Sequence, residues 1–395
     1  MDKVDLIATA AFGLEASVAY ELKQLGYTDQ HVEPGRITFR ADYTAIARAN
    51  MFLRVADRVL LRVGEFPAST FDELFDGVRY LPWGDWLAED AYFPVDGKSV
   101  KSTLTSVPAV QGVVKKAIAD AMAERYGRAT SPETGDRAKI LVSLLEDVAT
   151  LTIDTSGEGL HKRGYRPLNV TAPLKETLAA GLISIARWFP DRPFADPLCG
   201  SGTLPIEAAM IAQKIAPGKL RRFDAEHWPV LPAQLWRDVR TEALDKEDRR
   251  VEFDIQGSDI DPTVLEYARK HADVVGLGRR IRFEQTAVKD FKPTSEYGWI
   301  ITNPPYGERL GTAAEVEELY RQMGEAFQAD APTWSVYVLT GYERFERFYD
   351  KVAAKKRKLY NGQIRCDLYA YPGPRKPRFT VLEMPTDLPT EEATD

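Results

Sequence analysis

The second half of the chain alternates between two hydrophobic patterns. Short apolar runs, typical of buried strands, are separated by segments in which apolar residues recur every three or four positions, as in amphipathic helices. We expect strands at 193–196, 251–258, 281–283, 300–302, 335–339, 358–360 and 368–371, and helices at 173–189, 203–215, 262–275 and 314–327. Strands that alternate with helices predict a parallel, doubly wound α/β sheet, in which ligands bind at the carboxyl ends of the strands.

The first half carries two smaller α+β patterns. The first should hold strands at 5–10 and 36–39 with helices at 14–25 and 42–52, and the second strands at 58–64, 92–95, 138–144 and 148–154 with a helix at 106–126. Changes of pattern and composition divide the chain into five regions. They are a small unit over 1–60, a second unit over 61–155, a linker over 156–171, the α/β domain over 172–384 and a disordered acidic tail over 385–395.

Composition narrows the class of protein. Of the 395 residues, 44% are hydrophobic and 28% are charged, which is typical of globular proteins. The chain lacks the run of about 18 apolar residues that a membrane span requires, and its charged start does not resemble a signal peptide. The two cysteines and four scattered histidines lack disulfide or metal-ligand spacing, so we expect a cytoplasmic protein without a metal site.

Basic residues are clustered although the net charge is −7. The clusters lie over 98–116, 161–166 and 355–378, whereas acidic residues collect on helix faces and in the tail. A basic patch on an acidic protein can bind phosphate locally, although a single patch is also typical of a solvated surface. The candidate phosphate-contacting residues are Lys98, Lys101, Lys115, Lys116, Lys162, Arg163 and Arg166.

Asp196 opens a glycine-containing loop directly after the first expected strand of the α/β domain. Gly200 and Gly202 permit a tight turn and the close approach of a ligand to the backbone. A dinucleotide fingerprint would carry a third glycine where Pro205 stands, so a nucleoside ligand without phosphates is favoured. A carboxylate at this strand end suits a cationic amino-acid group, and a purely structural turn is the alternative.

A second acidic residue, Asp259, stands at the end of the next strand. Its carboxylate could accept hydrogen bonds from both ribose hydroxyls of an adenosine, while Asp261 is expected to cap the helix that starts at Pro262. The interval from Asp196 to Asp259 far exceeds the ~20 residues of a lean strand–helix–strand unit. Residues 217–248 therefore form an insertion that either walls the site or covers the sheet.

The strand that ends at Thr302 runs directly into Asn-Pro-Pro-Tyr-Gly. The prolines fix φ and remove backbone donors, which leaves an amide oxygen at Asn303, a main-chain acceptor at Pro304 and a flat ring at Tyr306 close together. This set of groups suits the NH2 group of a planar base. An ordinary turn after a buried strand is the competing interpretation.

The three motifs occur in order at successive strand ends, over 196–203, 257–261 and 303–310. Together they resemble the class I S-adenosylmethionine-dependent methyltransferases. The basic run over 161–166 and the segment over 172–178 narrow the resemblance to the THUMP-domain RNA methyltransferases, in the bacterial group related to the 23S ribosomal RNA guanine-N2 methyltransferase L. The resemblance covers about residues 4 to 383.

The resemblance implies a fold, a cofactor and a partner. A ferredoxin-like unit and a THUMP domain should precede a Rossmann-like class I methyltransferase domain with a seven-stranded, mostly parallel sheet, and no second methyltransferase domain is expected. S-adenosylmethionine would be the cofactor and RNA, ribosomal RNA first of all, the partner of the basic residues. The implied catalytic residues are Asn303, Pro304 and Tyr306, and the implied cofactor contacts are Asp196, Pro197, Cys199, Gly200, Gly202, Thr203, Asp259, Ile260 and Asn303.

One position departs from the family pattern. An acidic residue often follows the third strand of the family's sheet, where it contacts adenine, but Ala287 stands in that place here. Gln285 or backbone amides would have to make the adenine contact.

The implied reaction is methylation of guanine N2 in 23S ribosomal RNA. Transfer RNA and the N6 amine of adenine remain open, because the corner over 303–306 suits any planar amine. A non-catalytic RNA-binding assembly factor is a weaker alternative, since the cofactor motifs are intact. A nicotinamide dehydrogenase is disfavoured by Pro205 and by the lack of an acid/base group for hydride transfer.

Overall fold

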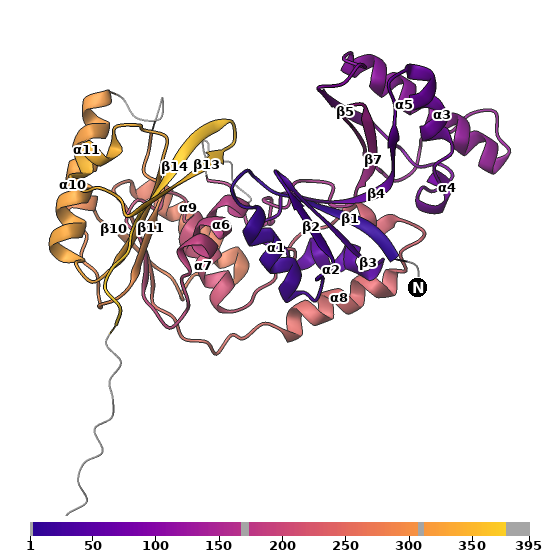
Figure 1. Cartoon of the computed structure of the whole chain (residues 1–395). Coiled ribbons are helices and arrows are strands. Elements are labelled where there is room, and N and C mark those ends of the chain that lie inside the picture. Colours follow the sequence, from indigo (N-terminus) through magenta and orange to yellow (C-terminus); the bar gives the residue numbers. More distant parts are fainter. Residues whose placement is uncertain (1–2, 167–173, 307–311, 377–395) are drawn as a thin grey trace, which may run out of the picture.

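The computed structural model describes residues 3–166, 174–306 and 312–376, which form two halves of different architecture (Figure 1). The expected acidic tail over 385–395 and the last residues of the expected linker, 167–171, lie outside the described residues. The first half is α+β, and the second is a doubly wound α/β domain, so the predicted fold class is confirmed.

A single seven-stranded sheet runs through the whole N-terminal half, in the order β2-β3-β1-β4-β7-β6-β5. Its strands are β1 Lys3–Thr9, β2 Gln30–Glu33, β3 Arg36–Asp42, β4 Arg58–Pro67, β5 Val95–Val100, β6 Ile140–Leu145 and β7 Val148–Asp154. The strand β4 joins the two expected units, because its ten residues are long enough to pair with β1 near one end and with β7 towards the other. The two units therefore share one sheet.

Five helices accompany this sheet. They are α1 Glu15–Gln24, α2 Thr44–Phe52, α3 Phe71–Arg79, α4 Trp83–Trp86 and α5 Val107–Tyr126. The expected strand at 92–95 is misplaced, because the paired strand is β5, which runs parallel to β6 at the edge of the sheet. Alternate residues of β5 are exposed, so this strand lacks the apolar run that would predict it from the sequence.

The second sheet has the order β10-β9-β8-β11-β12-β14-β13. Its strands are β8 Phe194–Asp196, β9 Ile255–Asp259, β10 Arg282–Gln285, β11 Trp299–Thr302, β12 Ser335–Thr340, β13 Lys355–Asn361 and β14 Ile364–Tyr371. The pairs from β10 to β12 are parallel, and β14 is antiparallel to both β12 and β13. Only β14 runs against the other described strands, which confirms a mostly parallel sheet of seven strands.

The helices of this half are α6 Glu176–Ala186, α7 Thr203–Ala212, α8 Ala233–Asp245, α9 Pro262–Val275, α10 Ala313–Asp330 and α11 Phe345–Tyr349, with short 3-10 turns η1 Asp224–His227 and η2 Val288–Asp290. The cap of α9 is the expected one: Thr263 N donates to the Asp261 carboxylate at 2.8 Å, and Gly276 closes the helix with φ of +78°. Almost every side chain of α6 is buried, because this helix also packs on α1 of the N-terminal half.

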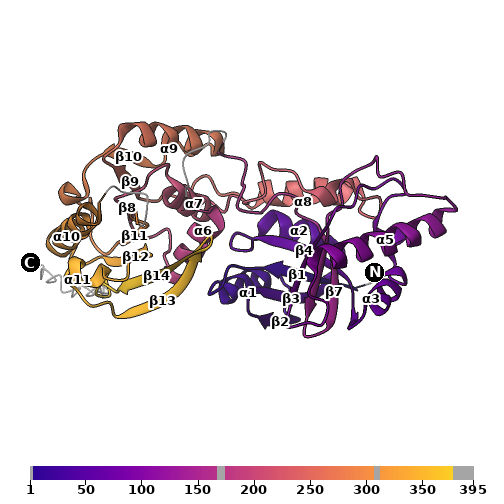
Figure 2. The ribbon, with the colours of Figure 1, turned by 90° about the horizontal axis from the view of Figure 1, so that it is seen from above.

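The insertion over 217–248 covers the N-terminal half rather than the second sheet. Its helix α8, Ala233–Asp245, lies along α2 in both views (Figures 1 and 2). Arg48 of α2 donates to Glu242 of α8 through Nε at 3.0 Å and Nη2 at 2.9 Å. The insertion is therefore a strap between the two halves, a role that the sequence did not indicate.

Candidate active site

Three strand ends meet at the carboxyl edge of the second sheet. The strand β8 lies in the middle of this sheet. The next two strands along the chain, β9 and β10, lie on one side of it, and β11 and β12 lie on the other. Asp196 ends β8, Asp259 ends β9, and Asn303 directly follows β11. The first two motifs and residues 303–306 of the third therefore come together at a switch point, where doubly wound sheets bind ligands, while 307–310 lie outside the described residues.

The loop from β8 to α7 is held by its own backbone and by Asp259. Gly200 N donates to Asp259 Oδ2 at 2.9 Å, and Cys199 N donates to the carbonyl of Ser258 at 2.9 Å. Both glycines have positive φ, +52° at Gly200 and +82° at Gly202. A Cβ at Gly202 would lie 2.9 Å from the Cβ of Ala268, whereas a Cβ at Gly200 would meet nothing within 4 Å. Gly202 thus serves packing, and Gly200 leaves open space above the loop.

Burial dominates the electrostatics of the two carboxylates. Burial, assisted by the nearby Asp259 charge, raises the pKa of Asp196 to about 7, although Leu198 N donates to its Oδ1 at 3.2 Å. Burial also raises the pKa of Asp259, against the hydrogen bonds from Asp261 N and Gly200 N. A cationic ligand group placed beside Asp196 would favour the ionised carboxylate.

The other predicted cofactor contacts surround this loop. Ile260 is 67% exposed and, together with Asp259, lines an open pocket of ≈ 590 Å³ that Leu198, Pro305 and the start of α10 also border. Pro197, Cys199 and Thr203 are buried. Burial raises the pKa of the Cys199 thiol well above its ordinary value, which argues for packing rather than reactivity. The Gln285 side chain donates to the carbonyl of Ile260 at 3.1 Å, at the place where an adenine contact is expected.

The corner after β11 presents an unused acceptor. Among the described residues, Asn303 Oδ1 is buried and has no hydrogen-bond partner. Pro304 is buried beside it, and the ring of Tyr306 is only 3% exposed. The Tyr306 hydroxyl accepts a hydrogen bond from Asn361 Nδ2 at 2.8 Å, and Tyr320 Oη donates to the carbonyl of Pro305 at 3.3 Å. Neither Asn361 nor Tyr320 was predicted, because nothing in the local sequence marks a partner 55 or 15 positions away.

These features fit an adenosine cofactor that carries an amino-acid group. The open space above Gly200 admits a ligand close to the backbone, and the Asp259 carboxylate at the strand end suits ribose hydroxyls. Asn303 Oδ1 supplies a buried acceptor that an amine would satisfy. Among the described residues, no group of three or more His, Cys, Asp or Glu could hold a metal ion.

The predicted phosphate contacts are scattered over both halves. Lys98 is exposed, and Lys101, Lys116 and Lys162 keep well-exposed side chains that pair with Glu146, Asp120 and Glu158. Lys115 is mostly engaged internally, since its Nζ lies 3.7 Å from the centre of the Phe93 ring and donates to Phe93 O at 2.9 Å. The four exposed lysines stay predictions as RNA contacts.

The prediction that Arg163 contacts RNA is wrong. Its side chain is buried and donates to the carbonyls of Leu160 and Arg54 and to the carboxylate of Glu207 on α7. Arg166 is also directed inward, because it donates to Leu174 O and Thr203 Oγ1 and pairs with Glu176 at 3.2 Å. Both arginines therefore join the linker to the catalytic half, and the basic run over 161–166 is largely structural.

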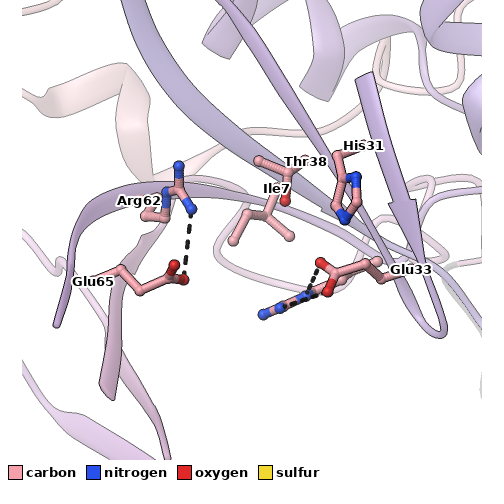
Figure 3. A pocket seen from close by; sticks show the side chains of 7 residues that line it. Ile7, His31, Glu33, Thr38, Arg62 and Glu65 are labelled. Carbon is pink, nitrogen blue, oxygen red and sulfur yellow. Dashed lines mark hydrogen bonds and ion pairs between the residues drawn. The ribbon is translucent and has the colours of Figure 1, made fainter. Parts of the chain in front are cut away.

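A pocket of ≈ 320 Å³ lies far from the strand ends, on the N-terminal sheet (Figure 3). Arg36 pairs with Glu33 at 2.8 Å, and Arg62 lies 3.5 Å from Glu65, so the carboxylates of this pocket engage both of its arginines. We assign no part of the reaction to it. None of the described helices combines the length and the apolar character needed to cross a membrane.

Comparison with known families agrees with this architecture. Residues 163–370 match the RMKL-like methyltransferase domain, residues 5–60 match the RlmL ferredoxin-like domain, and residues 68–154 match the THUMP domain.

Curated relatives carry related names. YpsC of Bacillus subtilis, whose name gives RNA methyltransferase as a provisional assignment, is 49% identical over 94% of this chain and 96% of its own length. The ribosomal RNA large subunit methyltransferase K/L of Methylococcus capsulatus is 36% identical over 93% of this chain and 51% of its own length. The chain thus spans about half the length of this K/L relative.

Solved structures superpose over nearly the whole chain. SMU.472, described as a provisional methyltransferase in complex with SAH, is 46% identical with a TM-score of 0.89 over 95% of this chain and 100% of that one. A Listeria monocytogenes protein, described as a predicted N6-adenine-specific DNA methylase, is 54% identical with a TM-score of 0.90 over 95% of this chain and 97% of that one.

Proposed function

Because the chain belongs to the RMKL-like methyltransferase family, we propose that it methylates the N2 amine of a guanine in ribosomal RNA. The resemblance found in the sequence motifs is confirmed by the family matches, and the cofactor is S-adenosylmethionine. The THUMP match and the K/L relatives support RNA as the substrate. The choice of guanine, and of ribosomal RNA, is the part that we propose.

The observation that carries methylation of a base amine is the unused acceptor of Asn303 at the end of β11, and the choice of guanine rests on the family. An exocyclic base amine is a poor nucleophile, because its lone pair is delocalised into the ring. Hydrogen bonds from this amine to Asn303 Oδ1 and to the Pro304 carbonyl would localise the lone pair and stabilise the positive charge that develops on nitrogen. Tyr306 would stack on the base, a contact that contributes about 1–3 kcal/mol, but its ring is only 3% exposed in the ligand-free chain, so stacking requires the corner to open when the base binds.

The other two strand ends would hold the cofactor. Asp259 would accept the ribose hydroxyls, Asp196 would face the cationic amino group, and Gly200 would let the ligand approach the loop. When bound, S-adenosylmethionine supplies a sulfonium methyl group, which the amine takes as the sulfur–carbon bond breaks and a thioether leaves. The methylated nitrogen is acidic, so its proton passes to solvent without a strong general base. Since paired bases are inaccessible, the target base must be flipped out or unpaired.

The main alternative is methylation of the N6 amine of adenine. The corner suits any planar amine, and the description of the Listeria monocytogenes structure names N6-adenine in DNA. The THUMP match over 68–154 favours RNA over DNA, but it does not choose between the two bases.

One experiment separates these possibilities. The purified chain is incubated with methyl-labelled S-adenosylmethionine and unmodified transcripts of ribosomal RNA, unmodified transfer RNA, or DNA, and the labelled nucleoside is identified by mass spectrometry. We expect N2-methylguanosine from ribosomal RNA only. Label in N6-methyladenosine would overturn the choice of base, and label confined to transfer RNA or DNA would overturn the choice of substrate.

A further inference from the structure

The hairpin formed by β13 and β14 reaches the corner that holds Asn303. Two side chains of the hairpin donate to the hydroxyl of Tyr306: Asn361 Nδ2 at 2.8 Å and Cys366 Sγ at 3.3 Å. Asn361 ends β13, and Cys366 pairs with Leu359 on the neighbouring strand. Tyr306, the fourth residue of the Asn-Pro-Pro-Tyr motif, is thus hydrogen-bonded to a hairpin that begins about 50 residues later in the chain.

These hydrogen bonds lie out of water. Tyr306 is 3% exposed, Asn361 8% and Cys366 1%. A buried polar group that loses its hydrogen-bond partner is left without water to replace it, whereas the same loss at the surface costs little. These two buried hydrogen bonds therefore hold the Tyr306 hydroxyl in one position.

The corner has a second attachment on its other side. Tyr320 of α10 donates to the carbonyl of Pro305 at 3.3 Å and shares a hydrogen bond of 2.9 Å with Thr340 Oγ1, at the end of β12. Pro305 and Tyr306 are thus held from two elements, and Asn303 and Pro304 lie directly before them. Proline rings restrict φ, so a displacement of Tyr306 is passed to its neighbours rather than absorbed between them.

The same hairpin contacts the N-terminal half. The ring of Phe12 meets the ring of Tyr360 edge-on, with 5.9 Å between centroids, and a Cβ at Gly13 would lie 2.8 Å from the carbonyl of Lys358. The hairpin therefore lies between the half that carries the THUMP domain and the corner that would grip the base.

We propose that Asn361 is a positioning residue, which sets the placement of the Asn303 amide oxygen and the Pro304 carbonyl through its hydrogen bond to the Tyr306 hydroxyl. This inference rests on the proposed function of the corner as the base grip. Asn361 acts before any base arrives and touches neither substrate nor cofactor. Its loss should slow the chemical step and leave the binding of both ligands intact, because misplacement of reacting groups by about 1 Å can cost on the order of 100-fold in rate.

The test is a double-mutant cycle on Asn361 and the Tyr306 hydroxyl. Asn361→Ala and Tyr306→Phe each remove one side of the same hydrogen bond, and the exposed turn residue Gln363→Ala is the matched control. Each single variant should lower kcat by about 10- to 100-fold, while KM for RNA and Kd for SAH stay within about twofold. The double variant should be about as active as Tyr306→Phe alone, since that change already removes the hydrogen bonds that Asn361 and Cys366 donate to the hydroxyl.

Several outcomes would overturn the inference. They are losses that multiply in the double variant, an Asn361→Ala protein with normal kcat, and a loss of SAH affinity or melting temperature that accounts for the lower rate. The kinetics are measured on whichever nucleic acid the unaltered chain methylates. A different methylated base would therefore overturn the proposed guanine and leave the cycle measurable.

Discussion

Asn303 Oδ1 is a buried acceptor that lacks a hydrogen-bond partner among the described residues, at the end of a strand in the middle of a parallel sheet. Other buried side-chain atoms of the described residues share this property, so it is the unused acceptor together with its position directly after β11, at the switch point of the sheet, that favours a ligand group there. The sequence of the corner left a base grip and an ordinary turn open, and the unused acceptor favours the base grip that we propose.

Replacement of this amide tests its role directly. Asn303→Ala should lower turnover by on the order of 100-fold or more, since the loss of one preorganised hydrogen-bonding group in a transition state has effects of this size. SAH affinity, measured by calorimetry, should change little, because the carboxylates and glycines of the other two strand ends are untouched. Near-normal turnover of Asn303→Ala would rule out the mechanism.

Asp196 predicts a pH dependence of cofactor binding. Burial raises the pKa of this carboxyl to about 7 in the ligand-free chain, so the neutral form dominates below that pH. The cationic amino group of the ligand requires the carboxylate, and SAH affinity should therefore fall by up to about tenfold for each pH unit below 7 and level off above it.

The sign for stability is opposite. The pKa of Asp196 in the folded chain lies above the ordinary aspartate value of about 4, so the unfolded chain loses this proton first and the free energy of unfolding falls as pH rises from about 4 to about 7. The pH dependence of SAH affinity is measured by calorimetric titrations with SAH between about pH 4 and pH 8, with Asp196→Asn as the comparison. If the unaltered chain binds SAH equally well at pH values below and above 7, the predicted pH dependence of binding is wrong.

At the scale of elements, the loop from β8 to α7 contains two glycines that need glycine for different reasons. A Cβ at Gly202 would collide with Ala268 and Phe283, whereas the space at Gly200 is open. Gly202→Ala should lower both the melting temperature and SAH affinity. Gly200→Ala should lower SAH affinity with a smaller thermal effect, since a non-glycine residue in this conformation costs only about 1–2 kcal/mol. Thermal unfolding and calorimetry of both variants compare them, and a larger thermal loss for Gly200→Ala would reverse the assignment.

At the scale of the whole molecule, a buried ion pair joins the linker to the catalytic half. Arg163 and Glu207 are 2% and 0% exposed, and their Nε and Oε1 atoms lie 3.3 Å apart. Loss of one member leaves an uncompensated buried charge, so Arg163→Met should lower the free energy of unfolding by about 3–5 kcal/mol. The exposed neighbour Lys162→Met should stay within about 0.5 kcal/mol.

Urea unfolding of these two variants measures the difference. A change of less than about 1 kcal/mol in Arg163→Met would show that the pair contributes little beyond its packing. RNA affinity of Arg163→Met at a temperature where it remains folded should match that of the unaltered chain, because this side chain is buried away from the surface.

The sequence by itself determined the features that depend on neighbouring residues. The period of the apolar positions predicted the doubly wound sheet, and Asp261 was correctly predicted to cap α9. The order of Asp196, Asp259 and Asn303 at successive strand ends predicted one common site, because the carboxyl ends of parallel strands lie at one edge of a sheet.

Only the tertiary structure decided which polar side chains are buried and what they contact. Arg163 belongs to a basic run that is typical of a surface, yet its side chain is buried, where it pairs with Glu207, 44 positions away. The helix α8 covers α2 rather than the site, and Asn361 holds Tyr306 across 55 positions. Local patterns follow from backbone geometry and side-chain period, whereas the burial of a charge or an amide is settled by distant partners that only the packed chain brings together.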